Sequence, residues 1–343
     1  MSTTINHQVR LKSHPTGMPG PETWDFCTEP VPAPADGEFL ARVLCIAMDP
    51  AMRVWLNPGD SYVRHVRIGE VMRASVVAEV IASRHPDYAV GDRVAGRLGV
   101  QEYAICTGVD MIGHPVVKIP PGSAAPSAYL SVLGIPGLTA YFGLLDIGQP
   151  QPGQTVVVSG ATGAVGSVVA QIARLKGCRV IGIAGGADKC AYLTQTLRLD
   201  GAADYRADDL AGQLARLCPS GIDIYFDNVG GAVLDAALSC LALRARVVLC
   251  GSMSQYAAEG ASAGPRNYRA LLVKRARMEG FVLYDFGARY EQARADLARW
   301  LAEGALVARE EVMQGLQSFP QAMQRMLTGD KTGKLLIQVG EAP

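Results

Sequence analysis

A glycine-rich turn near the middle of the chain constrains the fold most strongly. It lies between an apolar run and a helix-like stretch, in the order TVVVS (155–159), GATGAVG (160–166) and SVVAQIARLKG (167–177). A near-continuous apolar run is typical of a parallel strand buried on both faces, and glycine is the preferred residue just past a helix. The segment therefore predicts a strand–turn–helix unit of a parallel sheet.

The glycines of this turn, Gly160, Gly163 and Gly166, follow the spacing G-x-x-G-x-x-G rather than the strict G-x-G-x-x-G. Either spacing permits a tight turn, close approach of the backbone to a pyrophosphate, and a helix N-terminus that faces this anion. A glycine triplet alone also fits an ordinary β–α turn. Its place after a strong strand and before a strong helix favours a dinucleotide-binding site.

Strand-like and helix-like segments alternate from about residue 131 to residue 303. The segments are RVIGIAG (179–185), DKCAYLTQTLR (188–198), GIDIYFDNVGG (221–231), LDAALSCLALRARVVLCGS (234–252) and RMEGFVLYDF (277–286). Repeated βαβ units of this kind indicate an α/β fold with a doubly wound parallel sheet, as in Rossmann domains.

The first 130 residues have a different texture, with short β-branched runs bounded by glycine and proline. The clearest are FLARVLCIAMDP (39–50), EVMRASVVAEVIAS (70–83) and GDRVAG (91–96). They predict a β-rich domain. A chain of 343 residues exceeds one ordinary hydrophobic core, so two domains are expected. The late apolar run LLIQV (335–339) is expected to return and pair with the first domain.

Charge and cysteine content exclude several classes of protein. Lys plus Arg equals Asp plus Glu at 32 each, which argues against a nucleic-acid partner bound through bulk positive charge. The eight cysteines have no C-x-x-C spacing, so we expect buried thiols in a reducing, cytoplasmic compartment. The N-terminus lacks the layout of a signal peptide, and glycines interrupt the longest apolar stretch. No membrane association is expected.

The end of the second strand bears on which dinucleotide binds. An NAD site places a carboxylate there to accept hydrogen bonds from the ribose 2′-hydroxyl. Here residues 183–186 read Ile-Ala-Gly-Gly, and Lys189 follows at the start of the next helix. Asp188 remains open as a displaced acid. We favour Lys189 as the partner of a 2′-phosphate, supported by Tyr205 and Arg206, which predicts NADP(H).

Several longer segments carry a family resemblance. They are LGIPGLTAYFGLLDIG (133–148), residues 153–186, DNVGG (227–231), MDPAMR (48–53), SYVRHVRIGEVMR (61–73), EYA (102–104) and GDKTGK (329–334). In this order they resemble the zinc-independent medium-chain dehydrogenase/reductases, in the branch of prostaglandin reductases, leukotriene B4 12-hydroxydehydrogenases, plant double-bond reductases and curcumin reductases. The likeness covers nearly the whole chain.

The resemblance implies a fold, an activity and an assembly. The expected fold is a GroES-like substrate domain at 1–130, completed by 304–343, with a Rossmann NADPH-binding domain at 131–303. The implied reaction is NADPH-dependent reduction of the carbon–carbon double bond of α,β-unsaturated ketones and aldehydes, carried out by a homodimer.

The resemblance also implies the site residues. Gly163, Ala164, Val165 and Gly166 are expected to bind the pyrophosphate. Lys189 and Tyr205 are expected to bind the 2′-phosphate. The nicotinamide half is lined by Asn228, by the run that contains Cys250, Gly251, Ser252 and Tyr256, and by Phe281, Val282 and Leu283.

The residues give no support for a metal ion. A catalytic zinc needs a set of cysteine, histidine and carboxylate ligands, and no histidine of this chain is followed by glutamate. Cys45 has no evident set of partners. Without zinc, hydrogen-bond donors must stabilise the enolate that forms when hydride reaches the β-carbon. Tyrosine hydroxyls and the cofactor's ribose hydroxyl are the candidates, and the resemblance points to Tyr256 and Tyr62 as catalytic residues.

The chain departs from the family pattern in three places. Ala51 stands where the family commonly has an aromatic residue, which should widen the substrate pocket or shift its preference. Lys331 replaces an asparagine, which removes support for a cofactor contact there, and GRLGVQEY (96–103) lacks the usual tryptophan. Quinone reduction, oxidation of a secondary alcohol, and NADPH binding without turnover remain the alternative functions.

Overall fold

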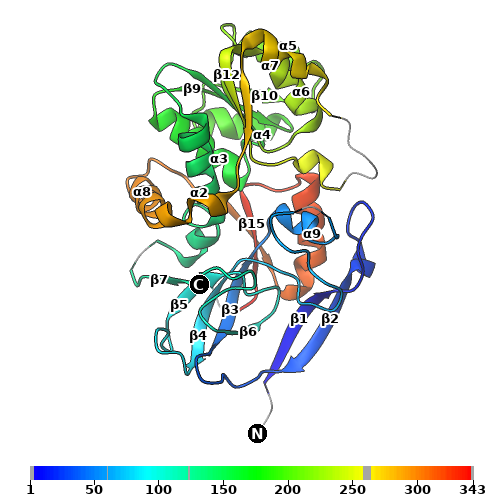
Figure 1. Ribbon diagram of the computed structural model, residues 1–343, viewed down its shortest axis with the longest axis vertical. Helices are drawn as coiled ribbons and strands as arrows, with labels where there is room; N and C mark the ends of the chain where they lie inside the picture. The colour runs from blue at the N-terminus through cyan, green and yellow to red at the C-terminus, as the bar shows by residue number, and fades with distance from the viewer. Residues whose placement is uncertain (1–3, 60, 123, 258–263, 341–343) are drawn as a thin grey trace. The chain divides into compact units, whose positions relative to one another are not determined.

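The computed structural model describes residues 4–340 except 60, 123 and 258–263, and divides into two compact units (Figure 1). The first comprises residues 1–130 and 310–343, and the second residues 131–309. The expected second boundary lay after residue 303. Residues 304–309 instead belong with the Rossmann unit, where Val307 N donates to Gln171 Oε1 at 2.7 Å and Val307 O accepts from Gln171 Nε2 at 3.1 Å.

The first unit is built on a seven-stranded sheet of order β14-β15-β3-β4-β5-β7, with β6 also paired to β3. A separate antiparallel pair is formed by β1 and β2. The strands are β1 (Ile5–Leu11), β2 (Trp24–Pro30), β3 (Phe39–Ala47), β4 (Val76–Ser83), β5 (Arg93–Gly96), β6 (Tyr103–Cys106), β7 (Val117–Ile119), β14 (Glu310–Gln314) and β15 (Lys334–Gln338), and the helices are α1 (Ala51–Val54) and α9 (Phe319–Thr328).

The C-terminal strand returns to this unit, as the sequence predicts. Strand β15 pairs antiparallel with β3, with Leu336 opposite Ala47. The buried Lys334 at its start donates to Met48 O at 3.1 Å and forms an ion pair with the carboxylate of Asp49. Two segments far apart in sequence, GDKTGK and MDPAMR, are therefore joined by one buried ammonium group.

The β-branched run at 70–83 contributes one strand to the main sheet, and this strand, β4, begins at Val76. The preceding residues bond elsewhere, because Glu70 O accepts from Leu11 N and Met72 N donates to Val9 O. These contacts draw the segment toward β1 and away from the main ladder.

The second unit contains a six-stranded parallel sheet of order β10-β9-β8-β11-β12-β13. Its strands are β8 (Thr155–Ser159), β9 (Arg179–Ala184), β10 (Gly201–Asp204), β11 (Ile222–Asp227), β12 (Leu241–Leu249) and β13 (Arg277–Gly280). Its α-helices are α2 (Ile135–Phe142), α3 (Ala164–Leu175), α4 (Ala187–Ala191), α5 (Leu210–Leu217), α6 (Gly231–Ser239), α7 (Arg269–Lys274) and α8 (Tyr290–Ala302).

Helices cover both faces of this sheet. Val157 of β8 packs in a buried cluster with Leu214 of α5 and Leu234 of α6. Because side chains alternate along a strand, Val156 and Val158 point to the opposite face, where α3 contacts β8 and β9. This arrangement confirms the predicted doubly wound α/β unit, in which the chain reverses its direction of winding between β8 and β11.

Candidate functional site

The glycine turn between β8 and α3 has the geometry that its spacing predicts. Gly160 adopts a φ of +58°, and Gly163 N donates to Gly160 O at 2.9 Å to close the turn. At Gly166 a Cβ atom would lie 2.4 Å from Gly160 O, so any side chain would push the helix from the turn. The close packing of strand and helix therefore depends on glycine at position 166.

The N-terminus of α3 presents unsatisfied donors at this turn. The first intrahelical bond runs from Ser167 N to Gly163 O at 3.0 Å, so the helix offers no carbonyl to the N–H groups of Ala164, Val165 and Gly166. Gly163 precedes the helix and has no side chain to cap them. Three adjacent donors and the positive end of the helix dipole suit a pyrophosphate.

The loops after β8, β11 and β12 meet at the carboxyl edge of the sheet. Asn228 Nδ2 donates to Ser159 O at 2.7 Å, and Asn228 N donates to Ser159 Oγ at 2.8 Å. Cys250 N and Gly251 N both donate to Asp227 O, at 2.9 and 3.0 Å. The structure thus brings together the glycine turn, Asn228 and the run that begins at Cys250, at the crevice where open α/β sheets bind ligands.

Tyr256 folds back onto its own loop. Its hydroxyl accepts a hydrogen bond from Ser252 N at 3.3 Å, which leaves the hydroxyl hydrogen to be donated elsewhere. Burial raises the pKa of Tyr256 above its ordinary value, so the phenol keeps its proton at neutral pH. A Cβ on Gly251 would lie 3.1 Å from this hydroxyl, and glycine there gives the ring its position.

The residues at 281–283, which are expected to line the nicotinamide half, follow strand β13 in the same unit. The ring of Phe281 occupies the space over Gly143, where a Cβ would meet it at 2.5 Å, and it lies edge-on to Phe226. Leu283 is buried, and its carbonyl accepts from Tyr290 Oη at 2.9 Å. Phe281 and Leu283 therefore pack within the unit, while Val282 between them is half-buried.

The turn after β9 and the segments beside it carry the residues that are expected at a 2′-phosphate. Tyr205 and Arg206 lie over Gly185, where a Cβ would meet the Tyr205 ring at 2.8 Å and Arg206 Nε at 2.9 Å. Lys189 is half-buried on α4, whereas Asp188 is exposed. One residue here has no sequence signal: Asp204 Oδ1 accepts from Gly186 N at 2.8 Å and from Arg206 N at 2.9 Å.

These two bonds give Asp204 a structural role. The two N–H groups hold the pKa of its carboxyl below the ordinary value, so the group stays ionised. One carboxylate thus satisfies Gly186 N, in the turn after β9, and Arg206 N, just after β10. Its spacing from Gly186 in the sequence is too large for a local motif to reveal the contact.

The remaining predicted residues lie in the first unit. Tyr62 is 64% exposed, on a loop after α1. Ala51 is the first residue of α1. Lys331 Nζ donates to Gly333 O at 2.9 Å within its own turn.

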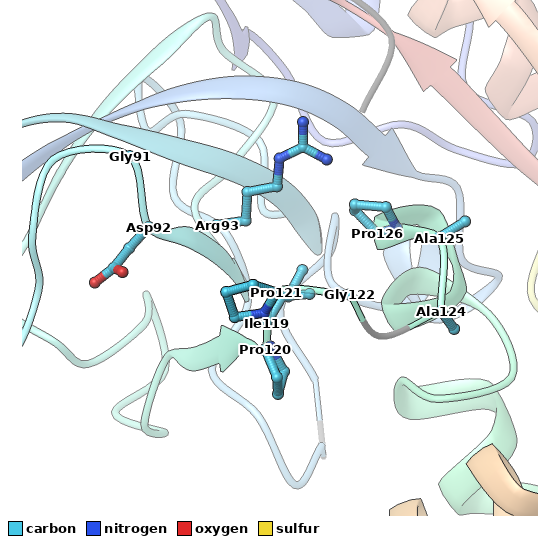
Figure 2. A pocket seen from close by; sticks show the side chains of 10 residues that line it. All are labelled: Gly91, Asp92, Arg93, Ile119, Pro120, Pro121, Gly122, Ala124, Ala125 and Pro126. Carbon is cyan, nitrogen blue, oxygen red and sulfur yellow. The ribbon is translucent and has the colours of Figure 1, made fainter.

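A surface pocket in the first unit is separate from all of these residues. Figure 2 shows it, lined by residues 91–93, 119–122 and 124–126. At its margin, Asp92 pairs with Lys118 at 2.6 Å. None of the predicted site residues lines it, so this pocket is not the candidate site.

The described residues form neither a metal-binding cluster nor a membrane-spanning helix. Within the described residues, no group of three or more histidine, cysteine or acidic side chains is arranged to hold a metal ion. In the same part of the chain, no helix has the length and apolar character needed to cross a membrane.

Comparison with known proteins agrees with this geometry. A family described as the N-terminal domain of oxidoreductase matches residues 7–113, and one described as zinc-binding dehydrogenase matches residues 164–302. NADPH-dependent curcumin reductase of Escherichia coli (strain K12) is 43% identical, with 97% of each chain covered. The NADP(+)-dependent 2-alkenal reductase of Nicotiana tabacum is 36% identical, again with 97% of each chain covered.

A solved structure extends the match to three dimensions. CurA of Vibrio vulnificus, in complex with NADPH, has a TM-score of 0.92 and 44% identity, with 98% of this chain and 99% of that chain covered. The fold and the glycine-turn site define a two-unit oxidoreductase of the Rossmann type. The chain belongs to the zinc-independent branch of the medium-chain dehydrogenase/reductases, with the curcumin, 2-alkenal and prostaglandin reductases. The resemblance read from the sequence is confirmed.

Proposed function

We propose that this protein reduces the carbon–carbon double bond of α,β-unsaturated ketones and aldehydes with NADPH. Family membership makes it an NADP-dependent oxidoreductase, and its relatives include a curcumin reductase and a 2-alkenal reductase. The observation that carries the proposal is the glycine turn whose helix N-terminus presents three unsatisfied N–H groups, at the sheet edge shared with Asn228 and the loop of Tyr256.

The chain's residues fit NADP(H) on three counts. The N–H groups of Ala164, Val165 and Gly166 suit the pyrophosphate, and a Cβ at Gly166 would displace them. Lys189 and Tyr205 flank the Gly185–Gly186 turn, and β9 itself ends without an acid, while the nearby Asp204 carboxylate accepts from Gly186 N and Arg206 N. On the other side of the switch point, the loop residues after β11 and β12 are proposed to line the nicotinamide half.

Tyr256 is proposed to donate a hydrogen bond to the substrate carbonyl oxygen. When bound, NADPH supplies the hydride that adds to the β-carbon. Negative charge then develops on the carbonyl oxygen, and a preorganised donor stabilises it. The Tyr256 hydroxyl already accepts from Ser252 N and keeps its own hydrogen at neutral pH because burial raises its pKa. Tyr62, in the first unit, is proposed as a second contact to the substrate.

The first unit is proposed to supply the substrate domain, and the protein is proposed to form homodimers in the cytoplasm. Strand β13 ends the described sheet and pairs on one side only, with β12. Near it, Leu272 of α7 is 75% exposed, and Leu243 of β12 is also exposed. A second copy of the chain that pairs along β13 would cover such residues. All eight cysteines are free thiols, as suits a reducing compartment.

Turnover with a panel of substrates tests the activity. Loss of NADPH absorbance with 3-nonen-2-one or a 2-alkenal, and none with NADH, is the expected result. The product should be the saturated ketone or aldehyde rather than an unsaturated alcohol. Consumption of NADPH with quinones alone would replace the proposal with quinone reduction. Tight NADPH binding without turnover over the whole panel would show a binding protein.

A further inference from the structure

Asp227, at the end of β11, is a buried acid with an unusual set of partners. It is 1% exposed. Its Oδ1 atom accepts four hydrogen bonds, from Ser159 Oγ (3.1 Å), Tyr225 Oη (3.1 Å), Val229 N (3.1 Å) and Gly230 N (2.9 Å). Two of these donors are backbone N–H groups of the loop after β11, so the carboxyl group fixes the course of that loop.

The same residue connects three strand ends. Its backbone carbonyl accepts from Cys250 N and Gly251 N, which follow β12. Ser159, at the end of β8, donates to Oδ1 while its hydroxyl oxygen accepts from Asn228 N at 2.8 Å. The loops on the β11 and β12 side of the switch point thus depend on Asp227 for their relative placement.

The other carboxyl oxygen shows that stability alone does not explain this acid. Asp227 Oδ2 is buried and has no hydrogen-bond partner in the described part of the chain. An unsatisfied buried polar atom costs about 1–3 kcal/mol. Burial also raises the pKa of Asp227, against the hydrogen bonds that lower it. One carboxyl oxygen of Asp227 is therefore left without a hydrogen bond, while the other accepts four.

We infer that Asp227 is a positioning residue for the nicotinamide half of the dinucleotide. Through Oδ1 it sets the turn that carries Asn228, and through its carbonyl it sets Gly251, whose neighbour Ser252 donates to the Tyr256 hydroxyl. In the described part of the chain its side chain bonds to Ser159, directly before the glycine turn, but to no residue of the turn itself and not to Lys189. The inference rests on the proposed function only in naming which half of the cofactor these loops meet.

Two ligands separate this role from general support of the fold. NADPH has both halves, whereas 2′-phospho-ADP-ribose has the pyrophosphate and the 2′-phosphate but no nicotinamide. For Asp227→Ala, the dissociation constant of NADPH is expected to rise about tenfold, because the loop that carries Asn228 loses the carboxyl group that holds its N–H groups. The dissociation constant of 2′-phospho-ADP-ribose is expected to stay within about twofold of the wild-type value, because its contacts are made elsewhere.

Asp227→Asn provides the conservative variant. Its amide oxygen can replace Oδ1 as acceptor, so the NADPH constant should return to within about threefold of wild type. Asp110→Ala is the matched control, since Asp110 is a buried acid of the first unit whose Oδ1 accepts from Ile112 N and His114 N. This control should lower the unfolding temperature without a selective loss of NADPH.

Isothermal titration of the full-length variants with both ligands gives the constants, and thermal unfolding reports stability. Equal weakening of the two ligands by Asp227→Ala, or no weakening of either, would overturn the inference. If the alanine variant does not fold, Ser159→Ala removes one donor to Oδ1 and should cause a smaller selective loss of NADPH. A loss shared equally by both ligands would overturn it there too. None of these readings requires turnover, so a failed enone assay leaves this test intact.

Discussion

Replacing Gly166 with alanine tests whether the cofactor site depends on close packing of the glycine turn. The new Cβ would lie 2.4 Å from Gly160 O, 2.9 Å from Gly160 C and 3.0 Å from Ala161 Cα. All three atoms are backbone, so no flexible side chain can move aside. The first contact is about 1 Å short of an ordinary van der Waals separation, and helix α3 must withdraw from the turn by a similar distance.

Two opposing effects determine how much Gly166→Ala lowers the free energy of unfolding. Overpacking of this kind costs about 1–3 kcal/mol, whereas glycine to alanine within a helix gains about 0.5–1 kcal/mol. The net destabilisation is therefore at most about 2.5 kcal/mol, and each kcal/mol lowers the unfolding temperature of a unit this size by about 2–4 °C. Withdrawal of α3 also carries its N–H groups away from the pyrophosphate. Losing about 1.4 kcal/mol of that hydrogen bonding weakens NADPH binding tenfold.

Fluorescence titration with NADPH and thermal unfolding of the same preparation measure both effects. Gly287→Ala is the control, because a Cβ there meets nothing within 4 Å, and it should change neither value. A Gly166→Ala protein that binds NADPH and unfolds like the wild type would refute the reasoning. It would show that the turn tolerates a side chain and that the anion is held by other groups.

Three further predictions address the chemistry. Tyr256→Phe should lower kcat for enone reduction about 10²-fold, because an oxyanion donor is lost, and should change NADPH affinity little. Unchanged kcat in steady-state assays would remove Tyr256 from the mechanism. Lys189→Ala should raise KM for NADPH about tenfold and leave KM for NADH unaltered, whereas an equal rise for both would show that the phosphate is held elsewhere. Because the pKa of Asp204 is lowered by N–H donors from Gly186 and Arg206, its contribution to stability is present above its unfolded-state pKa of about 3.9 and is lost as pH falls through the folded value. Unfolding temperatures measured between pH 7 and pH 3 should show this loss, and an Asp204→Asn variant with the same acid limb would contradict the assignment.

Local signals were enough to predict the centre of the Rossmann unit. The apolar run before Gly160 and the helix that ends just before Gly177 are set by neighbouring residues, and Gly177 has the positive φ of +75° that favours glycine past a helix. The family segments added the order of the units. Those segments are also patterns of neighbouring residues, so they too could be recognised from the sequence alone.

Features that depend on distant contacts were less accessible. The prolines between residues 15 and 34 disfavour a helix but give no sign of a strand. Trp24–Pro30 nevertheless forms β2 because it pairs with β1, and Pro30 stands at the end of that strand. The ring of Phe281 lies over Gly143, more than a hundred residues earlier in the chain, and no local pattern in the sequence indicates this contact. Neither partner has a recognisable motif without the other.

The two acids that sequence reasoning missed show how the anion site acquires its donors. Asp204 accepts from Gly186 N, and Asp227 accepts from Val229 N and Gly230 N, so the N–H groups of the loops around the switch point are already occupied. The first turn of α3 has no such acceptor in its own helix or in a side chain of Gly163. Asp204 and Asp227 thus satisfy N–H groups of their own loops, whereas the first N–H groups of α3 find no carbonyl in their own helix and are available to a pyrophosphate.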